Sequence, residues 1–238
     1  SPDPLQFLYE YDDPLDREVV ALIASSLAYG RVAQILKDVR RVLNVLGPHP
    51  AEYLRHTDCD SLTTALCGFV HRFTDCGIMV DFLCHVRDAL AEYGSLENLF
   101  LAHYDGDTWQ AVEEFVGGLT KRQESAFLLP RPSKGSACKR LALFLRWLVR
   151  CDEVDPGGWR KITPDVLFVP VDTHMFNICS TLGLCSRKSA DGKAVKEITN
   201  AFKEISPLDP VKYDFALTRF GIRSDMTVEE LFAIWDKR

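Results

Sequence analysis

A lysine and an aspartate are the two side chains of this sequence best placed for covalent chemistry. Lys139 follows the small-residue stretch 135–138 and precedes a helical apolar pattern, beside Arg140. The positive potential of a helix N-terminus disfavours the ammonium form of a lysine and frees its amine for nucleophilic attack. Asp172 follows a Pro-rich loop and heads another apolar pattern, where an aspartate is held in a fixed orientation and stays ionised. An amine and a fixed carboxylate together suit attack on a carbon that develops positive charge.

Each of these residues also has a purely structural interpretation. A solvated lysine on a basic helix explains Lys139, and an N-cap alone explains Asp172. His174 lies two residues beyond Asp172 and has no metal partner at a helical spacing. We therefore expect His174 to serve the structure or to contact a nucleic-acid backbone rather than to take part in catalysis.

The elements that must position these residues are predicted to be helices, because helical periodicity recurs along the chain and strand alternation is almost absent. The best strand candidate, residues 167–169, is too short to found a sheet. Thr227 and Glu230 form a capping box before the last predicted helix. The predicted helices cover residues 16–30, 32–45, 61–73, 78–93, 96–104, 108–119, 137–150, 173–182, 193–205, 211–220 and 228–235. The sequence therefore predicts an all-α fold.

Charge is distributed unevenly along the chain. The net charge of −6 taken alone argues against a nucleic-acid partner. Between Arg131 and Arg150, however, there are six basic residues and no acidic one, so the rest of the chain carries about −12. Such a distribution allows an acidic protein to present a basic, DNA-binding face, although a solvated helix face explains a charge run equally well.

Length and composition are those of an ordinary globular protein. The 238 residues suffice for one large domain or for two small domains that share a cleft. No apolar run approaches the roughly 18 residues of a membrane span, and we see no export signal, so we expect a cytoplasmic protein. The eight cysteines form no CxxC pair and match no compact zinc or iron–sulfur spacing. We predict reduced, mostly buried thiols and no metal.

Several of these motifs resemble those of the helix-hairpin-helix (HhH-GPD) DNA glycosylases, the endonuclease III superfamily. Residues 135–139, Gly-Ser-Ala-Cys-Lys, resemble the end of the family's hairpin, and residues 171–174, Val-Asp-Thr-His, resemble the stretch that carries its catalytic aspartate. The spacing of 33 residues between Lys139 and Asp172, the turn at 27–31 and the lack of a four-cysteine loop are closer to the archaeal 8-oxoguanine branch. Residues 212–221 resemble the penultimate family helix in placement. The hairpin departs from the family pattern, because Ser133-Lys134 replace Leu-Pro and Ala137 replaces the second glycine.

The resemblance implies a two-lobed fold with an active site in the cleft between the lobes, one built from residues 18–150 and the other from 1–17 with 151–238. It implies a base-excision repair enzyme, a monomeric DNA glycosylase and AP lyase of the nucleoid, without a cofactor. This enzyme would flip an oxidised base, 8-oxoguanine first, out of double-stranded DNA. Lys139 would be the nucleophile and Asp172 the supporting carboxylate. The residues expected to bind DNA are Lys134, Gly135, Ser136, Ala137, Arg140 and His174, and those expected to line the base pocket are Ser26, Tyr29, Arg31, Trp147 and Phe215.

Two other functions compete with this interpretation. A non-catalytic DNA- or RNA-binding protein of the same fold would not need both Lys139 and Asp172. A helical scaffold would not need the acid-free basic stretch. The distance between the Lys139 amine and the Asp172 carboxylate separates these functions, because only the enzyme requires the two groups to converge in an open cleft.

Overall fold

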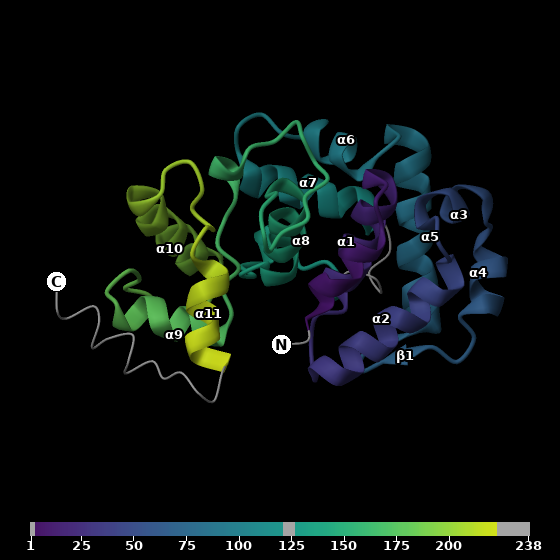
Figure 1. Cartoon of the computed structure of the whole chain (residues 1–238), viewed down its shortest axis with the longest axis horizontal. Coiled ribbons are helices and arrows are strands. Elements are labelled where there is room, and N and C mark those ends of the chain that lie inside the picture. The colour runs from purple at the N-terminus through teal and green to yellow at the C-terminus, as the bar shows by residue number, and fades with distance from the viewer. Residues whose placement is uncertain (1–2, 121–126, 223–238) are drawn as a thin grey trace.

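The computed structural model describes residues 3–120 and 127–222, and these residues are mostly helical, as the periodicity predicts (Figure 1). Among the described helices, none combines the length and apolar character needed to cross a bilayer. The α-helices are α1 (Pro14–Ser26), α2 (Val32–Leu46), α3 (Pro50–His56), α4 (Cys59–Ala65), α5 (Cys76–Tyr93), α6 (Leu96–Leu101), α7 (Thr108–Leu119), α8 (Lys139–Val149), α9 (Thr173–Thr181), α10 (Gly192–Ile205) and α11 (Asp214–Ile222). Short 3-10 helices are η1 (Pro4–Glu10), η3 (Pro132–Lys134) and η4 (Pro164–Val166), and the strands are β1 (Val70–His71) and β2 (Thr74–Asp75).

The helices are arranged along the long axis of the molecule. Figure 1 shows α9, α10 and α11 gathered at one end and α2 to α5 at the other, with α1, α7 and α8 between them. Helices α1 and α8 pack against each other, and α9 packs against α11. The N-terminal η1 contacts α1 and α2, and the Tyr9 hydroxyl donates to the carbonyl of Val154 at 2.5 Å. The division into lobes of residues 18–150 and the remainder stays a prediction.

A buried carboxylate connects α1 to two distant segments. Glu18 is almost fully buried and accepts hydrogen bonds from the backbone N–H groups of Leu96 and Glu97, at 2.7 and 3.1 Å. Its second partner segment is the loop after α8, from which Trp159 Nε1 donates at 2.9 Å. Burial raises the pKa of Glu18 to about 7, although the three donors oppose the shift. These contacts satisfy N–H groups in the first turn of α6 that no helical carbonyl reaches.

Two buried arginines, Arg146 on α8 and Arg150 directly after it, form ion pairs with carboxylates of other segments. Arg146, 3% exposed, donates from Nε to Asp155 at 3.1 Å and from Nη1 to Asp214, the first residue of α11. Arg150 donates to Asp155 at 2.9 Å and to Asp209 at 3.0 Å. Because a buried charge is stable only when it is paired, these contacts hold the loop after α8 and the start of α11 against α8.

The predicted helix over 61–73 is wrong in its second half. Helix α4 ends at Ala65, and residues 70–75 form an antiparallel hairpin in which Val70 pairs with Asp75 and His71 with Thr74. Gly68 adopts a positive φ of 71°, which ends the helical path. Val70 is exposed and His71 is buried, which is the alternation of a strand. A strand of two residues is too short to be recognised from its sequence pattern.

Other boundaries differ from the predicted ones for local reasons. A short helix, α3, begins at Pro50 directly after the predicted stop at Gly47-Pro48, because proline is favoured in the first turn of a helix. Helix α8 begins at Lys139 rather than at 137, since Cys138 has a positive φ of 49°. Residues 167–169 belong to no strand, and the N–H of Val169 donates to Thr199 Oγ1 at 3.1 Å. The predicted helix over 228–235 lies outside the described residues.

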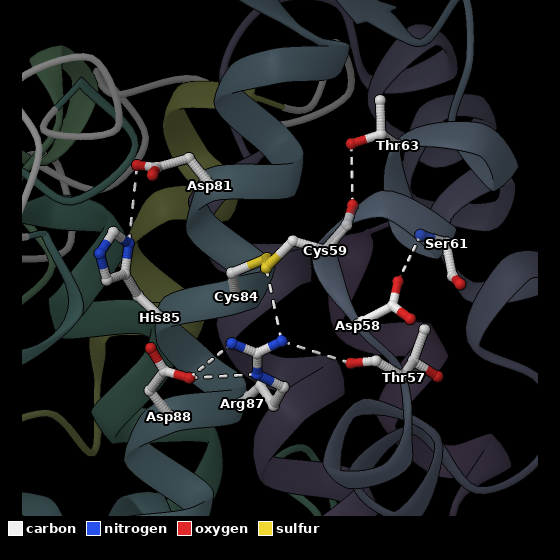
Figure 2. The surroundings of a disulfide bond; sticks show 10 residues. All are labelled: Thr57, Asp58, Cys59, Ser61, Thr63, Asp81, Cys84, His85, Arg87 and Asp88. Atoms are coloured by element: carbon white, nitrogen blue, oxygen red, sulfur yellow. Dashed lines mark hydrogen bonds and ion pairs between the residues drawn. A yellow bond between two sulfur atoms is a disulfide. The ribbon is translucent and has the colours of Figure 1, made fainter.

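The prediction that all cysteines are reduced is wrong for one pair. Cys59 at the start of α4 and Cys84 in α5 form a disulfide, with 6.0 Å between their Cα atoms (Figure 2). Arg87 Nη1 lies 3.4 Å from Cys59 Sγ and 3.4 Å from the carbonyl oxygen of Thr57. The spacing of 25 residues carries no signature, because two helices packed side by side bring the sulfurs together. The free cysteines are buried at 138, 179 and 185, partly buried at 76 and exposed at 67 and 151.

Replacement of Arg146 by methionine should destabilise the fold strongly. Methionine keeps most of the side-chain volume. It removes the positive charge that pairs with the buried carboxylates of Asp155 and Asp214. We expect the free energy of unfolding, measured with urea at neutral pH, to fall by about 3–5 kcal/mol. The loss should shrink at acidic pH, where protonation neutralises the two carboxyl groups.

Arg187→Met provides the matched control, because Arg187 and Asp191 form an ion pair on the surface, four residues apart in the sequence. This variant should unfold at nearly the same urea concentration as the wild type. Equal stability of Arg146→Met and Arg187→Met would contradict the structural role of the buried cluster.

Candidate active site

The two residues predicted to carry the chemistry are in direct contact. Lys139 Nζ donates a hydrogen bond to Asp172 Oδ2 at 2.8 Å, although the residues are 33 positions apart. The Lys139 side chain is 38% exposed and that of Asp172 is 19% exposed. The pair is therefore neither a buried structural ion pair nor a fully solvated one, and a ligand can reach it from solvent.

Local structure fixes both partners of the pair. Asp172 is the N-cap of α9, and its Oδ1 accepts from the backbone N–H of Met175 at 2.9 Å, which leaves Oδ2 for Lys139. Lys139 is the first residue of α8 rather than one turn inside it. The preceding Cys138 is buried, and its thiol lies 3.4 Å from the carbonyl oxygen of Pro130. The cap role and the predicted catalytic role of Asp172 are thus compatible, because the two oxygens serve different partners.

Electrostatics keep Asp172 ionised. Burial acts to raise the pKa of this carboxyl, but the charge and hydrogen bond of Lys139 and the N–H of Met175 outweigh it. The pKa of Asp172 is therefore lowered from its ordinary value. A carboxylate that stays charged and cannot rotate is suited to stabilising positive charge that develops next to it.

The pair lies in a pocket of about 100 Å³ built from four parts of the chain. Lys139, Arg146 and Trp147 occupy positions i, i+7 and i+8 of α8, so they share one face of that helix. Asp172 and the first residues of α11 line the opposite side, and Asp3 and Leu5 contribute from the N-terminus. At roughly 30 Å³ per water molecule the pocket holds a few waters. Admission of a nucleobase therefore requires the surrounding side chains to move.

Asp214 is the residue of this pocket that sequence reasoning missed. It is 4% exposed, and its Oδ1 has no hydrogen-bond partner among the described residues, while Oδ2 accepts from Arg146. Burial raises the pKa of Asp214 to about 6 against the opposing charges of Arg146 and Lys139. One signal was available: Arg146 stands within an apolar stretch of α8, where a charged residue needs a buried partner.

The two predicted aromatic residues are near the pair. Trp147 is 2% exposed, and both Trp147 and Phe215 line the pocket with Lys139 and Asp172. The guanidinium carbon of Arg146 lies 5.8 Å from the centre of the Phe215 ring. The pocket thus combines apolar walls with three carboxyl groups and two cations.

The residues predicted to grip DNA lie around the loop before α8 and at the start of α9. Lys134, Gly135 and His174 are exposed, and Ser136, Ala137 and Arg140 are partly exposed. Gly135 is left-handed and its carbonyl accepts from the N–H of Gly192, at the start of α10, at 3.1 Å. A side chain at Gly192 would come within 2.9 Å of Trp109, so glycine permits this close contact. The loop is therefore held on the same side of the molecule as α10.

The remaining predicted pocket residues are not in this pocket. The carbonyl of Ser26 accepts from Arg140 Nη1 at 2.9 Å, and the Tyr29 ring lies 5.2 Å from the same guanidinium. Arg31 is exposed and directly precedes α2. Ser26 and Tyr29 therefore lie against Arg140, the residue after Lys139. They do not line the pocket that contains Lys139 and Asp172. Among the described residues, no three His, Cys, Asp or Glu side chains are placed to hold a metal ion.

Comparison with known proteins gives one match. A family model with the description "Protein of unknown function (DUF2400)" matches residues 3–223. Searches of curated proteins and of solved structures found no match. The match covers most of the chain and names no activity, so the chemistry has to be inferred from the pocket.

Two carboxyl groups of the pocket, those of Asp172 and Asp214, should affect stability in opposite directions as pH changes. Asp172 has a lowered pKa, so the stabilisation it provides should be constant above about pH 5 and disappear as pH falls below 4. Asp214 has a pKa raised to about 6, so the folded state holds an extra proton between about pH 4 and 6, and stability should fall as pH rises through this window. Urea unfolding from pH 3 to 8 measures both effects.

Asp172→Asn and Asp214→Asn separate the two contributions. The first variant should lose the acidic dependence and the second should lose the slope between pH 4 and 6. If the pH profile of either variant matched that of the wild type, the assignment for that carboxyl would be wrong.

Proposed function

We propose that this chain, which belongs to the DUF2400 family, is a DNA glycosylase with AP-lyase activity. The observation that carries the proposal is the contact between Lys139 Nζ and Asp172 Oδ2 at 2.8 Å in a solvent-accessible pocket. A protein that only bound DNA, or a helical scaffold, would have no need to expose such a pair. The exposed loop before α8, in the most basic stretch of the chain, supports a nucleic-acid partner.

We further propose that the fold is of the HhH-GPD glycosylase type. The order of elements supports this: the short η3, a left-handed Gly135, then α8 with Lys139 at its start, then a Pro-rich loop that ends in an aspartate N-cap. Within the altered hairpin sequence, Ser136 Oγ accepts from the N–H of Cys138 at 3.1 Å directly before α8. The partner would be damaged double-stranded DNA, bound by a monomer in the nucleoid.

The chemistry of excision would proceed at C1′ of the damaged nucleotide. Asp172, ionised and fixed, accepts the proton of the Lys139 ammonium group and passes it to the departing base, so that it is again a carboxylate beside the positive charge that develops on the sugar. The Lys139 amine forms a bond to C1′ as the bond to the base breaks, and the base leaves with a proton. Loss of the ring C–O bond then gives a Schiff base between Lys139 and the sugar. A proton is removed from C2′, and the 3′ phosphate leaves by β-elimination.

An oxidised purine, 8-oxoguanine first, is the proposed substrate. Asp214 Oδ1 is a buried acceptor in the pocket, and purines of this class offer N–H donors on their edges. Trp147 and Phe215 provide apolar walls for a flipped base. A good bidentate contact to a base discriminates between bases by about 1–3 kcal/mol.

Lys139→Gln should abolish the covalent protein–DNA adduct that borohydride traps from a Schiff base. The glutamine retains a hydrogen bond to Asp172 but has no nucleophilic amine. Because the pair is partly exposed, stability should change by no more than about 1 kcal/mol. Denaturing gels with a labelled duplex that contains an abasic site measure the adduct.

Lys134→Gln is the matched control, since Lys134 is an exposed lysine five positions earlier in the same basic loop. This variant should still form the adduct. Trapping that survives in Lys139→Gln and disappears in Lys134→Gln would transfer the nucleophile to Lys134.

Asp172→Asn should keep α9 capped, because asparagine is an equally good N-cap, and should lower the rate of excision by about 100-fold or more. Single-turnover assays on duplexes with 8-oxoguanine, thymine glycol, uracil or an abasic site measure this rate and the substrate preference together. Faster release of thymine glycol than of 8-oxoguanine would reject the purine assignment. Nicking of the abasic duplex alone would reduce the activity to that of a lyase.

A further inference from the structure

The tip of the β1–β2 hairpin presents an exposed aromatic residue that the proposed chemistry does not use. Phe73 is 67% exposed, and its ring lies 5.7 Å from that of Phe127, which is 45% exposed. The Phe127 ring in turn lies 5.2 Å from the Tyr29 ring. Because Phe73 is mostly exposed, most of the stabilisation that burial of a phenylalanine provides is absent there.

Arginine side chains flank this row of rings. The guanidinium carbon of Arg72 lies 5.5 Å from the centre of the Phe73 ring. The guanidinium of Arg140 lies 5.2 Å from both the Tyr29 and the Phe127 rings, and its Nη2 donates to the carbonyl of Phe127 at 2.6 Å. We call this set the hairpin surface, and its members are Tyr29, Arg72, Phe73, Phe127 and Arg140.

Hydrogen bonds fix the β1–β2 hairpin to Tyr29 and Asp38. The Tyr29 hydroxyl lies 3.0 Å from the carbonyl oxygen of His71 and 2.7 Å from Thr74 Oγ1. Both ring nitrogens of the buried His71 face oxygens, Nδ1 at 2.6 Å from Asp38 Oδ2 and Nε2 at 3.1 Å from the Tyr29 carbonyl. These contacts involve His71 and Thr74, the buried residues of the hairpin, and do not involve Phe73 at its tip. Phe73 is thus held outward on a fixed support, which lowers the entropy that a ligand must overcome to stack on it.

We propose that the hairpin surface is a stacking site for an unpaired nucleobase of DNA, separate from the Lys139 pocket. Aromatic rings joined to guanidinium groups are the combination that binds bases by their faces and phosphates by their charge. Arg140 directly follows Lys139 in α8, so the hairpin surface reaches the residue next to the proposed nucleophile. The inference rests on the proposed DNA partner but not on the excision chemistry.

Binding of a fluorescein-labelled single-stranded oligothymidylate, followed by fluorescence anisotropy, tests the stacking site. Phe73→Leu keeps an apolar side chain without a π face, and we expect it to weaken binding by at least about 5-fold. Phe73→Trp should bind as tightly as the wild type or more tightly, because tryptophan stacks on bases. Leu208→Ala is the matched control: Leu208 is 82% exposed and is not part of the hairpin surface, so this change should leave binding unchanged.

Photocrosslinking locates the base directly. An oligonucleotide with a single 5-iodouracil forms a covalent bond on irradiation with an aromatic ring stacked on that base. After reduction of the Cys59–Cys84 disulfide and digestion with trypsin, the adduct should appear on the peptide that begins at Phe73, because trypsin cleaves after Arg72.

The outcomes separate this inference from the proposed function. Equal binding by the wild type, Phe73→Leu and Phe73→Trp would overturn the stacking site, even if borohydride trapping through Lys139 succeeds. The stacking site would also be overturned if Phe73→Leu bound like the wild type and Phe73→Trp bound less tightly. Binding would then not depend on an aromatic ring at position 73. Loss of binding in Phe73→Leu together with an absence of trapping in the wild type would uphold the stacking site and reject the glycosylase. A wild-type protein that binds no DNA would overturn both.

Discussion

The guanidinium group of Arg146 is the constraint on which the arrangement of the pocket depends. A charge inside a protein must be paired, and the two carboxylates that pair with Arg146 come from the loop after α8 and from the first residue of α11. Helix α11 packs on α9, and α9 begins at Asp172. The requirement to neutralise one buried cation is therefore what brings the aspartate of one segment to the lysine of another.

The same network gives the pocket its unusual charge balance. Lys139 and Arg146 lie on one face of α8, and Asp172 and Asp214 face them from the other side. Only Asp172 has its pKa lowered, because it is capping a helix and touching Lys139, whereas Asp214 is buried deeply enough for its pKa to be raised. Two carboxyl groups in one pocket thus differ in their ease of protonation because of burial and local partners, and such a difference is typical of sites where protons are transferred.

The sequence predicted those parts of the structure that local pattern determines. Helical periodicity located most helices, and the contact of Lys139 with Asp172 was anticipated from two motifs. Features that depend on tertiary packing were not anticipated. The hairpin is too short to show a strand pattern, the two partners of Arg146 lie in segments that no local pattern assigns to it, and the Cys59–Cys84 bond joins helices whose proximity no spacing reveals. The function itself, an oxidised-base glycosylase, stays a prediction of the motifs and a proposal from the pocket.

The disulfide between Cys59 and Cys84 has a topological consequence for the hairpin. The two cysteines bracket residues 60–83, so the whole of β1 and β2 lies inside a closed covalent ring. A single proteolytic cut within that ring would leave the two pieces joined, and they would separate on a gel only after a reducing agent had opened the bond. In an oxidising environment the backbone around Phe73 is therefore circular, and in a reducing one the hairpin is held only by its packing and by its contacts to Tyr29 and Asp38.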